Sequence, residues 1–262
     1  MLINYMLPQF TELNDYEYVI APLFNDQSYY NYVVSAGRVK PIIIDPGYYE
    51  GLTIDTNKYV DIINKFSNDA QTTNFTYVIP AFGESLDEII KTTYNWVNKY
   101  NHLPGKKMLY LGGTCYGCIM SQLNMVWSLN LDYFGIYWNN TAFKNSYTFI
   151  QNNYERLTYS RQMLLELIYM FYPTLNNRIH LYGYGMANEF KYYTKDKQYL
   201  KAMIHSINAL DVIASGIEGI KLSSNATSLD IKITDVINFK QSITIKNMCI
   251  NNVNTFKNIN SI

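Results

Sequence analysis

The sequence predicts an α/β protein built as a single (β/α)8 TIM-barrel-like domain, and three observations support this prediction. Short apolar runs rich in β-branched residues alternate with segments whose apolar residues recur at helical spacing. Successive apolar runs lie about 25–45 residues apart, which is the size of a strand with its crossover helix. The chain has 262 residues, 48% of them hydrophobic, which suffices for one barrel with a large core.

Seven strand-like runs lie along the chain. They span residues 18–21, 41–44, 77–80, 108–111, 133–137, 178–181 and 207–210. A closed barrel needs an eighth strand, which we expect after residue 211, at 219–222 or at 242–245. We treat 1–262 as one domain, in which 223–262 is the C-terminal segment. There we expect a loop at 223–230 and a terminal helix or frayed tail at 251–262.

The segments between the strands carry helix signals. Ser85 and Glu88 stand in the capping-box pattern, in which each side chain bonds the other residue's backbone amide. Apolar residues then recur at helical spacing from 86 to 100, and again from 157 to 171, just before Pro173. A shorter stripe covers 59–66. These faces predict helices that pack around the barrel.

The charge balance limits the possible partners. The formal net charge is zero, which argues against non-specific binding of nucleic acid over the whole surface. A local basic groove stays open, although each of its candidates also fits an ordinary solvated charge. These candidates are Lys106, Lys107, Arg156 and Arg161.

Several features predict the compartment. The first residues lack the basic start and apolar core of a signal peptide, and no run is long enough to span a membrane. Three cysteines without a regular framework suit a reducing environment, so we expect a cytoplasmic protein. The abundance of residues with AT-rich codons, including 26 tyrosines, suits a low-GC bacterium or its phage.

The strongest functional signal is a pair of acids at predicted strand ends. The run Ile42-Ile43-Ile44 stops at Asp45 and is followed by Pro-Gly, which predicts a buried strand and a tight turn. Asp211 follows the run 207–210 in a similar way. Barrel enzymes place their chemistry at the C-terminal ends of the strands, so we expect both carboxylates at one mouth. A lone strand-end Asp also commonly caps a turn or helix.

A set of motifs in chain order resembles the tRNA-guanine transglycosylase superfamily. Residues 45–50 (Asp-Pro-Gly-Tyr-Tyr-Glu) resemble its Asp-x-Gly-x-aromatic-Glu/Gln signature, and 180–185 (His-Leu-Tyr-Gly-Tyr-Gly) resemble its His/Tyr-Leu-x-Gly-x-Gly strand. Residues 206–211 look like the strand that carries the nucleophilic Asp, while 77–80 and 131–136 fall in the expected order. The family's members are TIM barrels that exchange guanine for a 7-deazaguanine base in nucleic acid. This chain is most similar to the compact phage and bacterial members that modify DNA.

The resemblance implies a pentosyltransferase without a cofactor. Asp211 would be the nucleophile that forms a covalent aspartyl intermediate, and Asp45 the general acid/base. Tyr49 and Tyr182 would sandwich the base. The remaining implied substrate-binding positions are Gly112, Gly113, Gly135 and Gly183. The partners would be DNA or tRNA, with the target nucleotide flipped out of a duplex, and a 7-deazaguanine base; a homodimer is plausible.

The chain also departs from the family pattern. The tRNA enzymes carry a zinc subdomain with a Cys-x-Cys-x-x-Cys run and a distant His, and this sequence has no such set. We therefore expect no metal and assign the pair Cys115 and Cys118 a structural role. Ala81 and Leu111 stand where the family usually has an acid and a Gln that contact the base. The inserted base, and the retention of activity itself, stay open.

Two other classes of function remain. One is a catalytically degenerate relative that binds nucleic acid or a base without exchanging it. The other is a carboxylate-dependent glycoside hydrolase, in which Asp45 and an acid such as Glu84 or Asp132 flank a sugar.

Four site residues also have simpler assignments. Tyr49 and Tyr182 equally fit packing, and Glu50 fits a solvated loop acid. His180 fits a buried, hydrogen-bonded histidine of a core strand.

Overall fold

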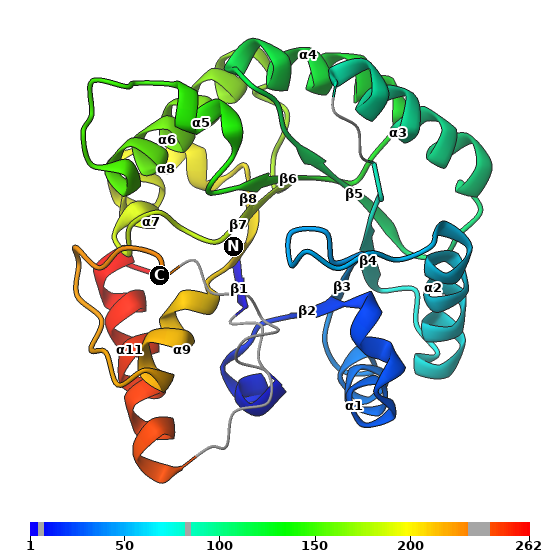
Figure 1. The fold of residues 1–262 in the computed structure, drawn as a ribbon, viewed down its shortest axis with the longest axis horizontal. Helices are drawn as coiled ribbons and strands as arrows, with labels where there is room; N and C mark the ends of the chain where they lie inside the picture. The colour runs from blue at the N-terminus through cyan, green and yellow to red at the C-terminus, as the bar shows by residue number, and fades with distance from the viewer. Residues whose placement is uncertain (5–7, 82–84, 230–241) are drawn as a thin grey trace.

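The computed structural model describes residues 1–4, 8–81, 85–229 and 242–262. Within these residues one eight-stranded, all-parallel sheet curls into a nearly closed barrel, and helices surround it (Figure 1). The strand order is β1-β8-β7-β6-β5-β4-β3-β2. The strands are β1 Leu2–Asn4, β2 Glu17–Ile20, β3 Ile42–Asp45, β4 Phe75–Val78, β5 Lys106–Leu111, β6 Tyr133–Tyr137, β7 Ile179–Tyr182 and β8 Ile204–Asn208. The barrel prediction is confirmed, and each of the seven expected runs overlaps a strand.

The eighth strand is β1, at the N-terminus, so its expected place after residue 211 is wrong. Leu2 and Ile3 pair with Ser206 and Ile207 of β8. Residues 219–222 form no strand, and 242–245 open helix α11, whose N-terminus Ser242 caps through its hydroxyl. A three-residue strand is too short to show periodicity, so only its partner strand reveals it.

Backbone and side-chain hydrogen bonds close the seam between β1 and the residues that lead into β2. The amide of Asp15 donates to the carbonyl of Ile3 at 2.9 Å, and the Asp15 carboxylate accepts from the Ile3 amide at 3.0 Å. The side-chain amide of Asn4 donates to the carbonyl of Tyr16 at 2.6 Å. The Tyr16 hydroxyl in turn donates to Asn208 Oδ1 at 2.5 Å. These bonds satisfy polar groups at the seam that strand-to-strand hydrogen bonds would pair in a fully closed barrel.

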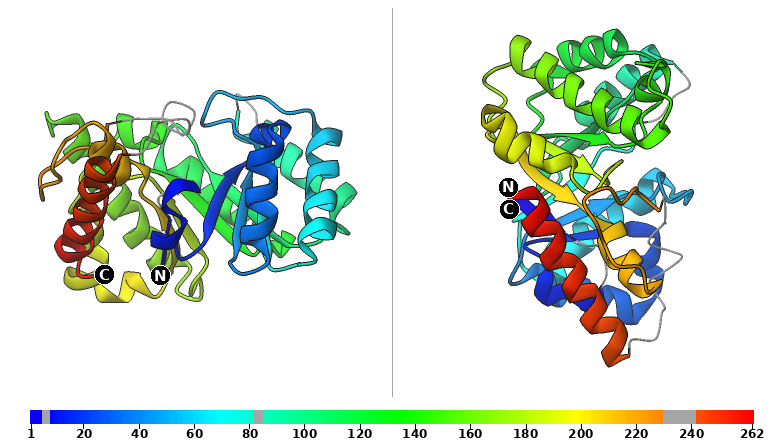
Figure 2. Two further views of the ribbon diagram at one scale, coloured as in Figure 1. Left: turned by 90° about the horizontal axis from the view of Figure 1, so that it is seen from below. Right: turned by 90° about the vertical axis from the view of Figure 1, so that its left-hand side faces the viewer.

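Helices follow most strands, as a βα barrel requires. The α-helices are α1 Gln27–Gly37, α2 Thr56–Ala70, α3 Leu86–Tyr100, α4 Tyr116–Val126, α5 Thr141–Asn145, α6 Asn153–Phe171, α7 Glu189–Lys191, α8 Gln198–Lys201, α9 Leu210–Ile217 and α11 Ile243–Asn260. The 3-10 helices are η1 Pro8–Leu13, η2 Ala21–Asn25 and η3 Trp127–Leu129, and η4 Tyr192–Asp196 is a π-helix. The Ser85–Glu88 capping box of α3 is present, and α11 packs beside α9 on the outside of the barrel (Figure 2).

Aromatic side chains fill the barrel interior. Tyr18 of β2 stacks on His180 of β7, with ring centroids 5.6 Å apart, and meets Tyr182 edge-on at 5.3 Å. The Tyr110 hydroxyl, from β5, lies 2.8 Å from that of Tyr18. Because β2, β5 and β7 are not neighbours in the sheet, these contacts cross the interior of the barrel. The interior is a packed core that opens at the C-terminal ends of the strands.

Candidate active site at the mouth of the barrel

Asp45 lies where the sequence predicts, as the last residue of β3. Its side chain is buried: Oδ2 accepts a hydrogen bond from the Tyr18 hydroxyl, and Oδ1 accepts one from the Gly47 amide at 2.5 Å. Burial raises the pKa of Asp45 from 3.8 to about 6, although both hydrogen bonds favour the charged form. A carboxyl group that titrates near neutrality can both donate and accept a proton in a reaction.

A cavity of about 320 Å³ opens beside Asp45, within the size range of ligand pockets. Its wall is aromatic and aliphatic, with few polar groups. The lining residues are Asp45, Pro46, Tyr48, Tyr49, Val78, Ile79, Ala81, Ile89, Tyr110, Leu111, Gly112, Tyr137 and Asn140. Among these described residues Asp45 is the one with an ionisable carboxylate, and none is Lys, Arg or His. The cavity therefore suits a neutral or cationic ring better than a phosphate.

Three stacked tyrosines form one side of this cavity. The rings of Tyr49 and Tyr137 are 4.8 Å apart at 13°, and those of Tyr137 and Tyr110 are 4.0 Å apart at 16°. Gly135 makes this stack possible, because a Cβ there would lie 2.4 Å from the Tyr110 ring. Of these three tyrosines, only Tyr49 was expected at the site from the sequence. Tyr110 and Tyr137 each lie within the last two residues of a strand, which is the signal that could have found them.

Tyr49 and Tyr182 do not face each other across a ligand-sized gap. Their ring centroids are 4.9 Å apart and their planes are inclined by 60°, so the two rings contact each other directly. Tyr182 is buried below Tyr49 and does not line the cavity. In this structure a base can stack on Tyr49, while Tyr182 supports the site from beneath.

Glu50 is a buried acid, so its assignment as a solvated loop residue is wrong. Its side chain is 5% exposed, and its Oε1 accepts a hydrogen bond from the Tyr182 hydroxyl at 3.0 Å. The loop that follows β3 turns at Pro46-Gly47 and folds back over the barrel, which carries Glu50 inward. Local polarity could not reveal this burial, because the partner tyrosine lies 132 residues away in the chain.

Asp211 lies at the same end of the barrel but in a different environment. It does not end a strand: β8 stops at Asn208, and Asp211 belongs to the first turn of α9. Its buried carboxylate accepts bonds from the Ser228 hydroxyl at 3.1 Å and from the Leu229 amide at 2.8 Å. Asp211 is not among the residues that line the cavity beside Asp45.

The four glycines implied by the resemblance differ in position. Gly112 lines the cavity, and its amide donates to Gln122 Oε1 at 2.9 Å. Gly135 lies under Tyr110, as described above. Gly113 packs against Cys118, and Gly183 has a φ of +66° and lies beneath the Trp138 ring. The last three do not line the cavity, and their roles in substrate binding stay predictions.

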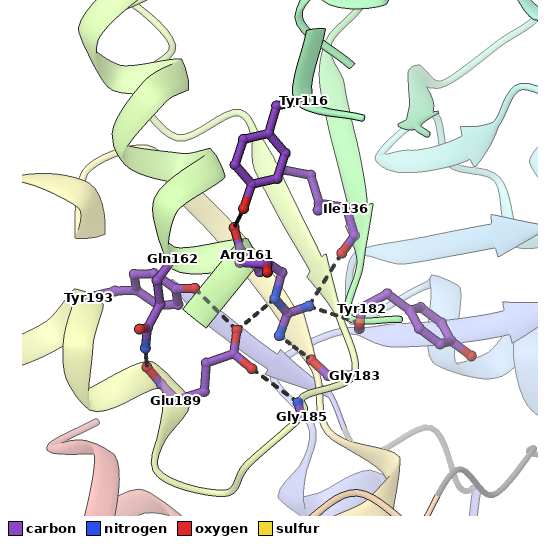
Figure 3. Close-up of polar contacts among 10 residues, drawn as sticks. Tyr116, Ile136, Arg161, Gln162, Tyr182, Gly183, Gly185, Glu189 and Tyr193 are labelled. Atoms are coloured by element: carbon purple, nitrogen blue, oxygen red, sulfur yellow. Dashed lines mark hydrogen bonds and ion pairs between the residues drawn. The ribbon is translucent and has the colours of Figure 1, made fainter. Parts of the chain in front are cut away.

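A buried ion pair holds the ends of β6 and β7 in place (Figure 3). Arg161 of α6 and Glu189 of α7 have no exposed side-chain surface, and Arg161 Nε donates to Glu189 Oε1 at 2.6 Å. The guanidinium also donates to the carbonyls of Tyr182 at 3.1 Å and Gly183 at 2.8 Å. Glu189 Oε2 accepts from the Gly185 amide at 3.1 Å. Arg161 is thus a structural clamp rather than a solvated charge.

The other basic candidates do not gather at the mouth. Lys106 and Lys107 open β5, so they lie at the end of the barrel opposite Asp45. Arg156, on α6, donates to Asn153 of its own helix. With Arg161 buried, these four side chains form no common groove.

His180 is a core histidine, as expected, although only one of its ring nitrogens is hydrogen-bonded and its buried Nε2 has no partner among the described residues. It is fully buried, and its Nδ1 lies 2.8 Å from the Ser206 hydroxyl. Burial lowers the pKa of His180 to about 3, so the imidazole is neutral under ordinary conditions. Its ring therefore supports Tyr18 without adding charge next to Asp45.

One of the two alternative partner acids, Asp132, can be placed as well. Asp132 precedes β6 and accepts from the Lys107 amide at 2.8 Å, at the end of the barrel opposite Asp45, so it cannot flank a substrate there. Glu84 lies outside the described residues. In the described part of the chain, no group of three or more His, Cys, Asp or Glu side chains gathers to hold a metal ion. No helix there is long and apolar enough to span a membrane.

Two of the three comparisons with known proteins found no match. No family model matches the chain, and no curated protein matches it. Among solved structures, one similar fold is active domain 2 of a chitinase from Pyrococcus furiosus, solved as catalytic-site mutants. The identity is 10%, the TM-score is 0.42, and the match covers 88% of this chain and 79% of that one. A likeness at this level assigns no function.

Proposed function

We propose that this protein is an enzyme of glycosidic-bond chemistry, with Asp45 as the group that transfers the proton. The observation that carries the proposal is one carboxyl group of raised pKa, about 6, at the mouth of a barrel and beside an aromatic cavity. Cleavage of a glycosidic bond needs an acid to protonate the leaving group, and a raised pKa keeps that proton available near neutral pH. The stacked tyrosines supply a face for a flat base or a sugar ring.

In its finer form, the proposal is exchange of guanine for a 7-deazaguanine base in DNA or tRNA. This form rests on the resemblance of the ordered motifs to the transglycosylase superfamily. Asp211 would trap the sugar C1′ as a covalent aspartyl intermediate, and Asp45 would protonate the departing base and later deprotonate the incoming one. None of the described residues that line the cavity is basic, which favours a base in this cavity, with the phosphates outside it.

Glu50 is a rival for the role of nucleophile. It lies five residues after Asp45 in the same loop, and Tyr182 links it to the aromatic cluster. Both carboxylates are engaged, Glu50 by Tyr182 and Asp211 by Ser228 and Leu229, and neither residue lines the cavity. If the second carboxylate is Glu50, the same cavity suits hydrolysis of a sugar glycoside, which is the second candidate function.

One set of assays separates these functions. The protein is incubated with labelled guanine and either DNA or tRNA, and in parallel with a panel of oligosaccharides. Incorporation of label supports base exchange, and release of reducing sugar supports hydrolysis. Binding of nucleic acid without incorporation or hydrolysis would instead identify a non-catalytic relative and contradict the proposal.

Variants of Asp45, Asp211 and Glu50 then show which residue is the proton donor and which is the nucleophile. Asp45→Asn should lower either activity by about 10²–10⁴-fold, the usual contribution of a general acid. A covalent protein–nucleic acid adduct should vanish in Asp211→Asn and persist in Glu50→Gln if Asp211 is the nucleophile. Asp61→Asn, an exposed acid of α2, is the control that should leave the activity unchanged.

A further inference from the structure

Cys115 and Cys118 lie close together at the surface, at the start of α4, and neither lines the cavity beside Asp45. Their Sγ atoms are 3.1 Å apart. Cys115 is exposed and Cys118 is half-buried, so both can be reached from solvent. From the sequence we expected a structural role for this pair, but two adjacent, accessible thiols can also take part in thiol–disulfide exchange.

The start of α4 creates this geometry. Cys115 is the N-cap residue, and its Sγ accepts from the Cys118 amide at 3.4 Å. The cap brings the side chains of residues i and i+3 to the same side of the first turn. Gly113 leaves room for the pair, because a Cβ there would lie 2.6 Å from the Cys118 Cβ.

The surroundings favour the thiolate of Cys118. A hydrogen bond with the Cys115 thiol, followed by one with Thr114, lowers the pKa of Cys118 below its usual value. Cys249 provides an internal contrast: it is buried, and burial raises the pKa of its thiol to about 11.

We propose that Cys115 and Cys118 are a redox-active dithiol that is oxidised reversibly to an intramolecular disulfide by small disulfides such as oxidised glutathione. A disulfide bond has a sulfur–sulfur distance of about 2.0 Å. The two sulfur atoms must therefore approach each other by about 1 Å, which rotation of the two side chains can supply. In the described part of the chain no third ligand accompanies the pair, so a closed metal site is not formed from it.

The reaction balances in two exchanges. The Cys118 thiolate attacks one sulfur of oxidised glutathione, which forms a mixed disulfide and releases one glutathione thiolate. The Cys115 thiol then loses its proton and attacks the Cys118 sulfur, which closes the internal disulfide and releases the second glutathione. One glutathione disulfide is reduced to two thiols, and the protein dithiol is oxidised.

The test equilibrates the full-length protein with mixtures of reduced and oxidised glutathione, followed by acid quenching and alkylation in denaturant. We expect wild type to lose two alkylation sites together while Cys249 is still alkylated, and the unalkylated oxidised protein to have an intact mass lower by two hydrogens than the reduced protein. Cys249→Ser should oxidise in the same way as wild type. Far-UV circular dichroism checks that each variant is folded.

Two single variants give the order of attack. Cys115→Ser should accumulate a glutathione adduct on Cys118, because the resolving thiol is gone while a hydroxyl donor remains. Cys118→Ser should react with oxidised glutathione several-fold more slowly. If both thiols stay alkylatable at every ratio, or if wild type carries two separate glutathione adducts, the proposal is wrong. Neither result bears on the glycosidic chemistry.

Discussion

The hydroxyl group of Tyr18 donates a hydrogen bond to the carboxylate of Asp45 inside the barrel, although the two residues come from neighbouring strands 27 residues apart. Tyr110 extends the contact, since its hydroxyl lies 2.8 Å from that of Tyr18. With Tyr18 donating to Asp45, the oxygen of Tyr18 can accept from Tyr110. The chain Tyr110–Tyr18–Asp45 orders the carboxylate and connects it to the cavity wall.

Removing the donor should raise the pKa of Asp45 further. In Tyr18→Phe the carboxylate loses a hydrogen bond that favours its charged form, a bond of this type being worth about 1.5–3 kcal/mol. We expect the pKa to move above its present value of about 6, measured by NMR titration of the Asp45 carboxyl carbon. Tyr59→Phe is the matched control, because the buried Tyr59 hydroxyl donates to the carbonyls of Ile44 and Val78. An unchanged pKa in Tyr18→Phe would contradict the assignment.

The same carboxyl group should make folding stability depend on pH. The pKa of Asp45 is 3.8 when unfolded and about 6 when folded, so the folded state holds the proton more tightly. Its contribution to stability is therefore complete below about pH 4 and is lost as pH rises through 6, by about 3 kcal/mol.

Asp45→Asn mimics the protonated form and tests this dependence. Urea denaturation should show the variant more stable than wild type above pH 6 and similar to it near pH 4. The exposed variant Asp61→Asn should follow wild type throughout. A constant difference between Asp45→Asn and wild type across this range would show that Asp45 does not titrate as proposed.

Breaking the Arg161–Glu189 pair should be costly. Arg161→Met leaves the Glu189 carboxylate buried without its cation and leaves the carbonyls of Tyr182 and Gly183 without their donor. We expect a loss of about 3–5 kcal/mol in the free energy of unfolding, with part of it recovered in the double variant Arg161→Met/Glu189→Gln. Lys65→Met, which breaks the exposed pair with Asp69, should have little effect. Equal effects of the two cation deletions would contradict the clamp.

Two glycines of the site should respond differently to a methyl group. In Gly135→Ala the new Cβ would lie 2.4 Å from the Tyr110 ring, so the ring must move and the stack with Tyr137 must open. We expect destabilisation of about 1–3 kcal/mol and a changed tyrosine signal in near-UV circular dichroism. In Gly112→Ala the nearest atom is Asn140 Nδ2 at 3.9 Å, so this variant should fold as wild type does. If Gly135→Ala is neutral, the stack is not constrained as described.

Some tertiary features had local signals in the sequence, and others had none. Asp45 was found because an apolar run, an acid and a Pro-Gly turn lie next to one another in the chain. Glu50 and Arg161 were missed because burial of a charge depends on a distant partner, here Tyr182 and Glu189. A solvated charge and a paired, buried one look the same in a single sequence.

The alternation of strands and helices could be predicted from the sequence, as could the Ser85–Glu88 cap and the strand-end position of Asp45, because each depends on residues a few positions apart. Three other relationships are visible only in the folded molecule: β1 supplies the eighth strand, Tyr18 and Tyr110 converge on Asp45, and Asp211 faces Ser228 and Leu229. These relationships come from closure of the sheet, which brings together residues that no local periodicity connects.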